Sequence, residues 1–178
     1  MNGILCINKP QDWTSFDVVN AISKKHRVKA GHTGTLDPQA TGVLVLLINQ
    51  TKVLPYLDMS TKRYTATCQL GLKTDTGDSW GKIIQEKPIQ TKLTEALLNE
   101  TLKSFIGLST QVVPMTSAKK FKGRKLYDYQ RNNEIIEPLV QKIEIFEIEL
   151  ISFTDTEFTF SALVSSGTYI RALCEDLA

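Results

Sequence analysis

Residues 31–42 read GHTGTLDPQATG and lead directly into VLVLLI at residues 43–48. The first stretch contains three glycines, four hydroxyl or amide side chains and a single acid, Asp37. The second is an apolar run with the length and composition of a strand buried on both faces. We therefore expect a polar loop, anchored by a core strand, that surrounds one carboxylate with exposed backbone N–H groups.

Two interpretations of this loop follow from its residues. Many backbone donors suit a phosphate cradle, but the GK[ST] ending of a P-loop and the GxGxxG fingerprint are absent, which disfavours nucleotide binding. Asp before Pro is also a common turn, so a structural role for Asp37 stays open. A basic partner would keep the carboxylate ionised, and Arg171, after a Ser-Ser-Gly turn, is one candidate.

The rest of the chain alternates strand and helix patterns without βαβ regularity, which favours an α+β fold. Alternation over residues 61–70 places Tyr64 on the apolar face, and Ser15 is the expected N-cap of an early helix. The remaining expected elements are strands at 3–8, 142–153 (bulged) and 157–164, and helices at 94–105 and from about 168 onward.

Residues 111–134 are polar, basic and weakly periodic, as expected of a long excursion from the core. One basic patch lies within it at 119–125, and another occupies 24–29. A basic run is also typical of a solvated face. The net charge of the 178 residues is only +2, so any nucleic-acid contact must come from such local patches.

Composition excludes several other classes. The chain is 42% hydrophobic, enough for one domain with its own core, and its apolar runs are shorter than the roughly 20 residues that span a bilayer. Its three cysteines include no CxxC pair, and its two histidines lack metal-ligand spacing. We expect no metal site and no disulfide framework; with no signal-peptide features, a cytoplasmic location follows.

The 31–42 loop resembles the signature of the TruB family of pseudouridine synthases. The resemblance covers the whole chain, because four further groups of residues occur in the family's order: Lys9-Pro10 with Thr14-Ser15, Lys62-Arg63-Tyr64, Ser117-Ala118-Lys119 with Gly123, and Gly167-Thr168-Tyr169-Ile170-Arg171. It implies the pseudouridine synthase fold, α+β, with a central mixed but largely antiparallel sheet flanked by helices.

The resemblance also implies an activity, isomerisation of uridine to pseudouridine at position 55 in the T loop of tRNA. Uracil would leave C1′, turn and return through C5, with neither cofactor nor metal. The expected partner is the T-arm of tRNA, and the expected state is a monomer.

Site residues follow from the same resemblance. Asp37 would be catalytic, Arg171 would pair with it, Tyr64 would stack on the flipped uracil, Tyr169 would line the pocket, and His32 would occupy space near the displaced base. The 111–134 segment matches an RNA-clasping insertion, expected to be mobile without RNA. The expected RNA contacts are Lys9, Lys119, Lys120, Lys122, Arg124 and Lys125.

Departures from the family pattern include Asp12 for a glycine, and Val113 and Thr116 for a proline and a tyrosine in the insertion. The family also continues beyond Ala178 with a pocket-floor segment and commonly a PUA domain, so residues 1–178 are expected to be a catalytic domain that is incomplete at its C-terminus. Three alternatives remain: an RNA-binding module without activity, a pseudouridine synthase of guide-RNA particles, and a nucleoside hydrolase.

Overall fold

The apolar run after the 31–42 loop forms β3, the central strand of a three-stranded antiparallel sheet in the computed structural model, which describes residues 2–57 and 60–178. This sheet belongs to the first of two compact units, Met1–Met59. The unit contains β1 (Gly3–Lys9), α1 (Ser15–His26), β2 (Ala30–His32), β3 (Gly42–Ile48) and the 3-10 helix η1 (Thr51–Tyr56).

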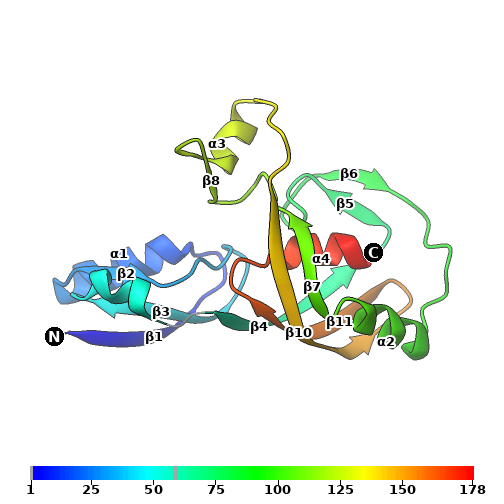
Figure 1. Cartoon of the computed structure of the whole chain (residues 1–178), viewed down its shortest axis with the longest axis horizontal. Coiled ribbons are helices and arrows are strands. Elements are labelled where there is room, and N and C mark those ends of the chain that lie inside the picture. The colour runs from blue at the N-terminus through cyan, green and yellow to red at the C-terminus, as the bar shows by residue number, and fades with distance from the viewer. Residues whose placement is uncertain (1, 58–59) are drawn as a thin grey trace. The chain divides into compact units, whose positions relative to one another are not determined.

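Helix α1 covers one face of the sheet, whose strand order is β1-β3-β2 (Figure 1). Its Val18 and Val19 pack in one buried cluster, the N-terminal core, with Leu44, Leu46 and Ile48 of β3. The expectation that the whole apolar run is buried on both faces is wrong at its first residue, since Val43 is 69% exposed. At the end that joins the loop, β3 is therefore buried on one face only.

The start of α1 differs from the sequence prediction by one residue. Thr14, rather than Ser15, is the N-cap: its Oγ1 accepts from the Asp17 N–H at 3.0 Å, and Asp17 Oδ2 accepts from the Thr14 N–H at 2.9 Å. This reciprocal pair is a capping box. The Thr14 hydrogen bonds lower the pKa of Asp17. Ser15 is thereby released from capping and serves the 31–42 loop instead.

The second unit, Ser60–Ala178, is built on a four-stranded sheet of order β4-β11-β10-β7. Every strand pairing found in the described residues of either unit is antiparallel, and helices accompany both sheets, so the α+β prediction is confirmed. The unit contains β4 (Thr61–Gln69), β5 (Leu72–Thr74), β6 (Ile83–Glu86), α2 (Glu95–Ser104), β7 (Gly107–Val112), β8 (Lys120–Phe121), β9 (Arg124–Lys125), α3 (Leu126–Arg131), β10 (Val140–Phe153), β11 (Glu157–Ser165) and α4 (Ile170–Leu177).

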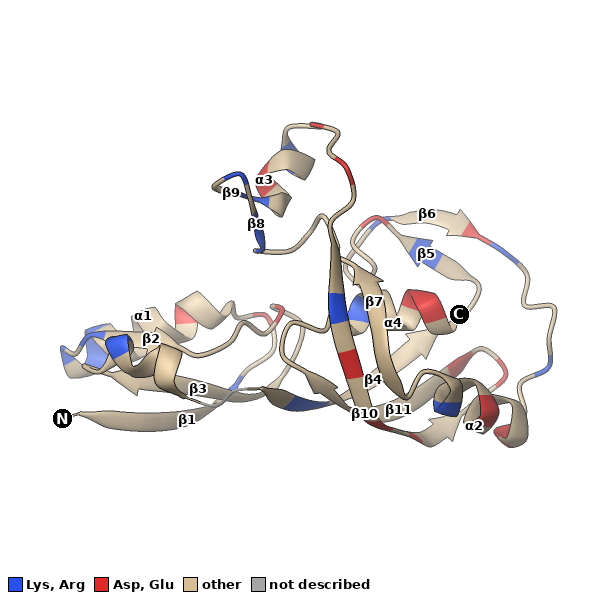
Figure 2. Cartoon of the chain, in the orientation of Figure 1, with Lys and Arg blue, Asp and Glu red and all other residues tan. Residues whose placement is uncertain are grey.

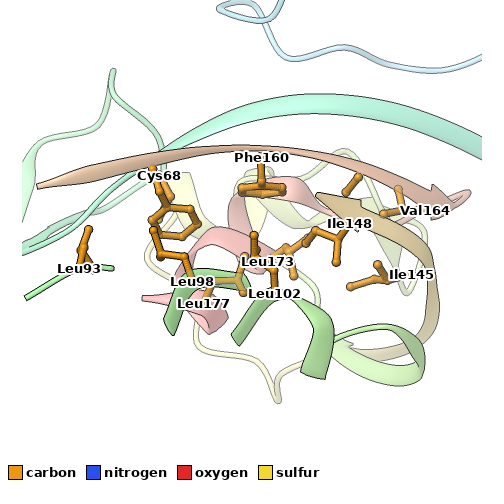
Figure 3. Close-up of a cluster of buried hydrophobic side chains, with 12 residues drawn as sticks. Cys68, Leu93, Leu98, Leu102, Ile145, Ile148, Phe160, Val164, Leu173 and Leu177 are labelled. Carbon is orange, nitrogen blue, oxygen red and sulfur yellow. The ribbon is translucent and has the colours of Figure 1, made fainter. Parts of the chain in front are cut away.

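Strict alternation along β11 sends every second side chain into the core of this unit. Phe158, Phe160, Ala162 and Val164 are buried there and meet residues of α2 and α4 (Figure 3). Tyr64 packs against the same cluster, as its alternation predicts. The predicted bulge in β10 is also confirmed, because its pairing with β11 shifts register twice.

Residues 111–134 are more ordered in secondary structure than their weak periodicity indicates. β7 continues to Val112, after which the chain forms the β8-β9 hairpin and α3. Leu126 and Tyr129 are buried, and the Phe121 and Tyr129 rings meet edge-on at 6.0 Å between centroids. Figure 1 shows this excursion projecting from the end of β10. No helix among the described residues is long and apolar enough to cross a membrane.

Candidate active site

Asp37 lies on the loop between β2 and β3, and hydrogen bonds from buried polar groups fix the backbone of that loop. The Ser15 hydroxyl, on a residue only 3% exposed, accepts from the Leu36 N–H at 2.9 Å and donates to the Leu36 carbonyl at 3.2 Å. The Thr33 N–H donates to the Val45 carbonyl at 3.0 Å, which ties the other side of the loop to β3. The residue before Asp37 is therefore held on both of its backbone polar groups.

Lys9 forms the second anchor, and here the sequence prediction is wrong. Its side chain is completely buried, and its ammonium donates to the carbonyls of Pro10 at 2.9 Å, Trp13 at 2.6 Å and Pro38 at 2.9 Å. An ammonium has three N–H donors, and all three are used. Burial lowers the pKa of Lys9, partly opposed by the charges of Asp12 and Asp37. Lys9 thus braces the loop and leaves no donor for an RNA phosphate.

Two buried polar atoms of residues 31–42 have no hydrogen-bond partner within the part of the chain that the structure describes. They are Nδ1 of His32, on β2, and Oε1 of Gln39, two residues after Asp37. A buried polar atom without a partner is costly, by about 1–3 kcal/mol. Such atoms fit a loop that completes its hydrogen bonds with a ligand. Gln39 lies in the signature loop, but no sequence pattern singles it out.

In the second unit, Tyr64 lies on β4 opposite Ala162 of β11 and is half-buried. Its contacts with the core fix the ring on the side of the sheet that carries the helices. The side chain has the placement of a core aromatic, and its partial exposure leaves ring surface for a stacking partner.

Arg171 lies in the first turn of α4 and is held by three groups of its own unit. Its Nη1 donates to the Thr76 carbonyl and to Thr116 Oγ1, each at 2.6 Å, and lies 3.6 Å from Asp78 Oδ2. The side chains of Arg171 and Asp78 are only 13% and 15% exposed. Arg171 is therefore a positioned, largely buried cation, and its interpretation as an ordinary surface arginine is excluded.

The turn that carries Asp78 has little freedom of its own. Oδ1 of Asp78 accepts from Thr76 Oγ1 at 2.7 Å and from the Trp80 N–H at 3.0 Å. A side chain at Gly81 would place Cβ 2.6 Å from Asp75 Oδ1, so only glycine fits there. The part that Asp78 plays in holding Arg171 has no signal in the spacing of the sequence.

Tyr169, the N-cap residue of α4, is fixed through its backbone. Its N–H donates to Gln111 Oε1 at 2.8 Å, and its carbonyl accepts from Gln111 Nε2 at 3.1 Å. Gln111 is only 2% exposed. Sequence reasoning missed Gln111, because a glutamine near the end of a strand is more often on a solvent face.

The turn before Tyr169 has a second amide contact. Gln141, the register partner of Gln111 on β10, donates to the Gly167 carbonyl at 2.6 Å. Lys119 in turn donates to Gln141 Oε1. One predicted RNA contact, Lys119, is thus already bonded to the side chain that holds this turn.

The other basic residues of the insertion are arranged with aromatic rings. Figure 2 shows Lys and Arg along β8 and β9. Lys122 Nζ lies 5.3 Å from the Phe121 ring centroid, at a turn where Lys122 has a φ of 47°. Arg124 lies 4.1 Å from the Tyr129 centroid and donates two hydrogen bonds to Glu134, at 2.8 and 3.2 Å. Those bonds raise the pKa of Arg124 and lower that of Glu134.

Lys120 and Lys122 are exposed, whereas Lys125 is half-buried and donates to the Tyr127 hydroxyl at 2.8 Å. That hydrogen bond raises the pKa of Lys125. Among the described residues there is no group of three or more His, Cys, Asp or Glu side chains that could hold a metal ion.

Comparisons with known proteins agree on one family. The model of the TruB family pseudouridylate synthase, N-terminal domain, matches residues 21–170. The chain is 45% identical over 181 aligned residues to tRNA pseudouridine synthase B of Oceanobacillus iheyensis, covering 99% of this chain and 60% of that protein. It is 42% identical to the protein of the same name from Aeromonas salmonicida, covering 99% of this chain and 56% of that protein.

Solved structures agree on the fold. A chain in the crystal structure of a Cbf5-Nop10-Gar1 complex matches with a TM-score of 0.72 at 25% identity, over 98% of this chain and 43% of its own length. The chain spans about 60% of the length of the curated relatives it matches. Because the family model covers most of the chain, and with it the Asp37 loop, the chain belongs to the TruB family of pseudouridylate synthases.

Proposed function

We propose that this chain provides the catalytic chemistry that converts uridine to pseudouridine at position 55 in the T loop of tRNA. The observation that carries the proposal is the fixed Asp37 loop. The side chains of Lys9 and Ser15 form hydrogen bonds with the backbone of Pro38 and Leu36, on either side of Asp37. Rigid support of a single carboxylate is expected of a residue that must meet a reacting atom within a fraction of an ångström. The family and its tRNA-modifying relatives support the same activity.

The reaction is redox-neutral and requires no cofactor for its balance. The C1′–N1 glycosidic bond breaks, uracil turns within the pocket, and C1′ bonds to C5. The proton on C5 is lost and N1 gains one, so atoms and electrons balance. Asp37 is the essential carboxylate of this rearrangement, acting as nucleophile or base.

The other site residues bind the substrate nucleotide. A uridine inside a folded loop must leave its stack, which costs a few kcal/mol, and stacking on Tyr64 offsets part of that cost, about 1–3 kcal/mol. Tyr169 lines the same pocket as Tyr64, and Arg171 contributes a fixed positive charge to the binding of the nucleotide. His32, whose buried Nδ1 has no hydrogen-bond partner among the described residues, contacts the nucleotides displaced from the loop.

The 111–134 insertion grips the RNA backbone. Lys120 and Lys122 are its best phosphate ligands because both are exposed and neither has a hydrogen bond or ion pair described for its ammonium. Lys119, Arg124 and Lys125 already have hydrogen-bond partners that RNA would have to replace or share. The insertion becomes more ordered on binding RNA. The enzyme acts as a monomer in the cytoplasm, where its tRNA substrate is found.

Release of tritium from unmodified tRNA labelled with [5-³H]uridine tests the proposal. The parent chain should release tritium, and Asp37→Asn should reduce the rate about a thousand-fold or more while binding tRNA within about threefold of the parent. Asp155→Asn, an exposed change of the same kind, is the control and should behave as the parent. Binding of tRNA by parent and variant alike, without release by either, would instead indicate an RNA-binding module.

A further inference from the structure

The amide of Gln111 makes an unusual contact with one residue of the proposed substrate pocket. Its oxygen accepts from the Tyr169 N–H at 2.8 Å, and its nitrogen donates to the Tyr169 carbonyl at 3.1 Å. Both functional ends of one side chain are thus used on the backbone of a single residue. The Tyr169 carbonyl also accepts from the Leu173 N–H at 3.0 Å, so both of its lone pairs have donors.

This contact replaces backbone pairing at a point where the chain changes direction. Tyr169 is the N-cap of α4 and has no side-chain capping bond, and the hydrogen bonds from Gln111 fix its backbone at this end of the helix. Gln111, near the end of β7, is 2% exposed, and a buried amide is tolerated only when its polar atoms are bonded. Packing alone would favour an apolar residue at this position.

We propose that Gln111 is a positioning residue for the proposed isomerisation, which sets the place of the Tyr169 ring through these two backbone hydrogen bonds. Both groups lie in the same unit, so the contact is independent of how the two units are arranged. The inference rests on the proposed function, because it takes Tyr169 as a substrate-binding residue. Gln141, which donates to the Gly167 carbonyl at 2.6 Å, supports the same turn from the next strand.

The first test replaces Gln111 by methionine, which keeps the volume and removes both hydrogen bonds. We expect Gln111→Met to lower the single-turnover rate of tritium release by about 10- to 100-fold, the scale of effect for a misplaced pocket group, with tRNA affinity within about threefold. In a Tyr169→Ala background the same change should have little further effect, because Gln111 acts through Tyr169. Full additivity of the two changes would overturn the proposal.

The second test uses pH. In Gln111→Glu, a protonated carboxyl has one donor and one acceptor and can replace both amide bonds, whereas the carboxylate repels the Tyr169 carbonyl. Burial and that carbonyl raise the pKa of the introduced acid above about 4.3. The rate of Gln111→Glu relative to the parent should therefore rise as the pH is lowered from about 8 to about 6. Gln69→Glu, at an exposed glutamine that donates to the Thr156 carbonyl, is the control, and its ratio should stay flat.

Amide hydrogen exchange separates failure of this inference from failure of the proposed function. Exchange at Tyr169 should accelerate at least about tenfold in Gln111→Met, whether or not the chain is active. An active parent whose Gln111→Met variant keeps the parental rate and exchange would refute the positioning role. A parent that releases no tritium would refute the proposed function, and the exchange rate at Tyr169 would still decide whether Gln111 holds that residue.

Discussion

The buried ammonium of Lys9 provides a direct test of what holds the catalytic loop. Replacing Lys9 by methionine removes one donor from each of the carbonyls of Pro10, Trp13 and Pro38, of which Pro38 still accepts from the Asp12 N–H at 3.0 Å. We expect the free energy of unfolding to fall by about 2–4 kcal/mol. Urea denaturation measures it, with Lys29→Met, at an exposed lysine, as the control. A loss below about 1 kcal/mol, or a clear change in the salt dependence of RNA binding, would contradict the bracing role and indicate that Lys9 contacts RNA phosphates.

Asp78 permits a second prediction at this scale. Asp78→Asn removes the charge 3.6 Å from Arg171 Nη1 and leaves the bonds of Arg171 to Thr76 and Thr116 in place. We expect tritium release to slow about tenfold, because a less firmly held guanidinium positions the substrate nucleotide less well. The melting temperature should change little. Parental kinetics in Asp78→Asn would show that the hydrogen bonds to the Thr76 carbonyl and the Thr116 hydroxyl are enough to position Arg171.

The sequence identifies such residues better than it identifies their contacts. Lys9, Asp37, Tyr169 and Arg171 all belong to recognisable motifs, so their importance could be predicted. That Lys9 faces inward could not, because a lysine at the end of an apolar strand is normally solvated and only the folded loop supplies three carbonyls around it. Gln111 was missed for the same reason, since its partner is a backbone 58 residues away.

At the scale of elements, the basic residues of the insertion differ in whether a hydrogen bond already ties them to the protein. We expect Lys122→Gln to reduce the slope of log affinity for tRNA against log salt by about 0.7–0.9, the value for one lost phosphate contact. Arg124→Gln should reduce the slope by less, because Arg124 is already bonded to Glu134 and lies over Tyr129. Filter binding of unmodified tRNA at several salt concentrations measures both. Equal changes in slope would show that RNA displaces Glu134.

Periodicity explains which elements could be predicted. β4, β11 and α2 are long enough for alternation or helical spacing to show, and each begins within one residue of its predicted start. The hairpin at 120–125 could not be found this way, because each of its strands has two residues. Its turn consists of Lys122 and Gly123, both at positive φ, and lies within a run that the sequence marks only as a basic patch.

At the scale of the whole molecule, sequence composition indicated one domain with one core, whereas the described residues form two compact units. Each has a buried cluster of its own, centred on β3 in the first and on β11 in the second. Composition is a sum over the whole chain, so it cannot show how the apolar residues are distributed between two cores. The expectation of a single catalytic domain over residues 1–178 stays a prediction, since two units can still act as one enzyme.

Two separate cores predict that damage to one remains local. Leu46, in β3, is completely buried, so Leu46→Ala should lower stability by about 2–5 kcal/mol. Amide hydrogen exchange should accelerate in β1 and β3 and stay near the parental rate in β10 and β11, because those strands pack in the other cluster. Phe160→Ala, in β11, should give the opposite pattern. Equal acceleration in both sheets from either change would mean that the units unfold together, and that the Asp37 loop and the Tyr169 segment share one cooperative structure.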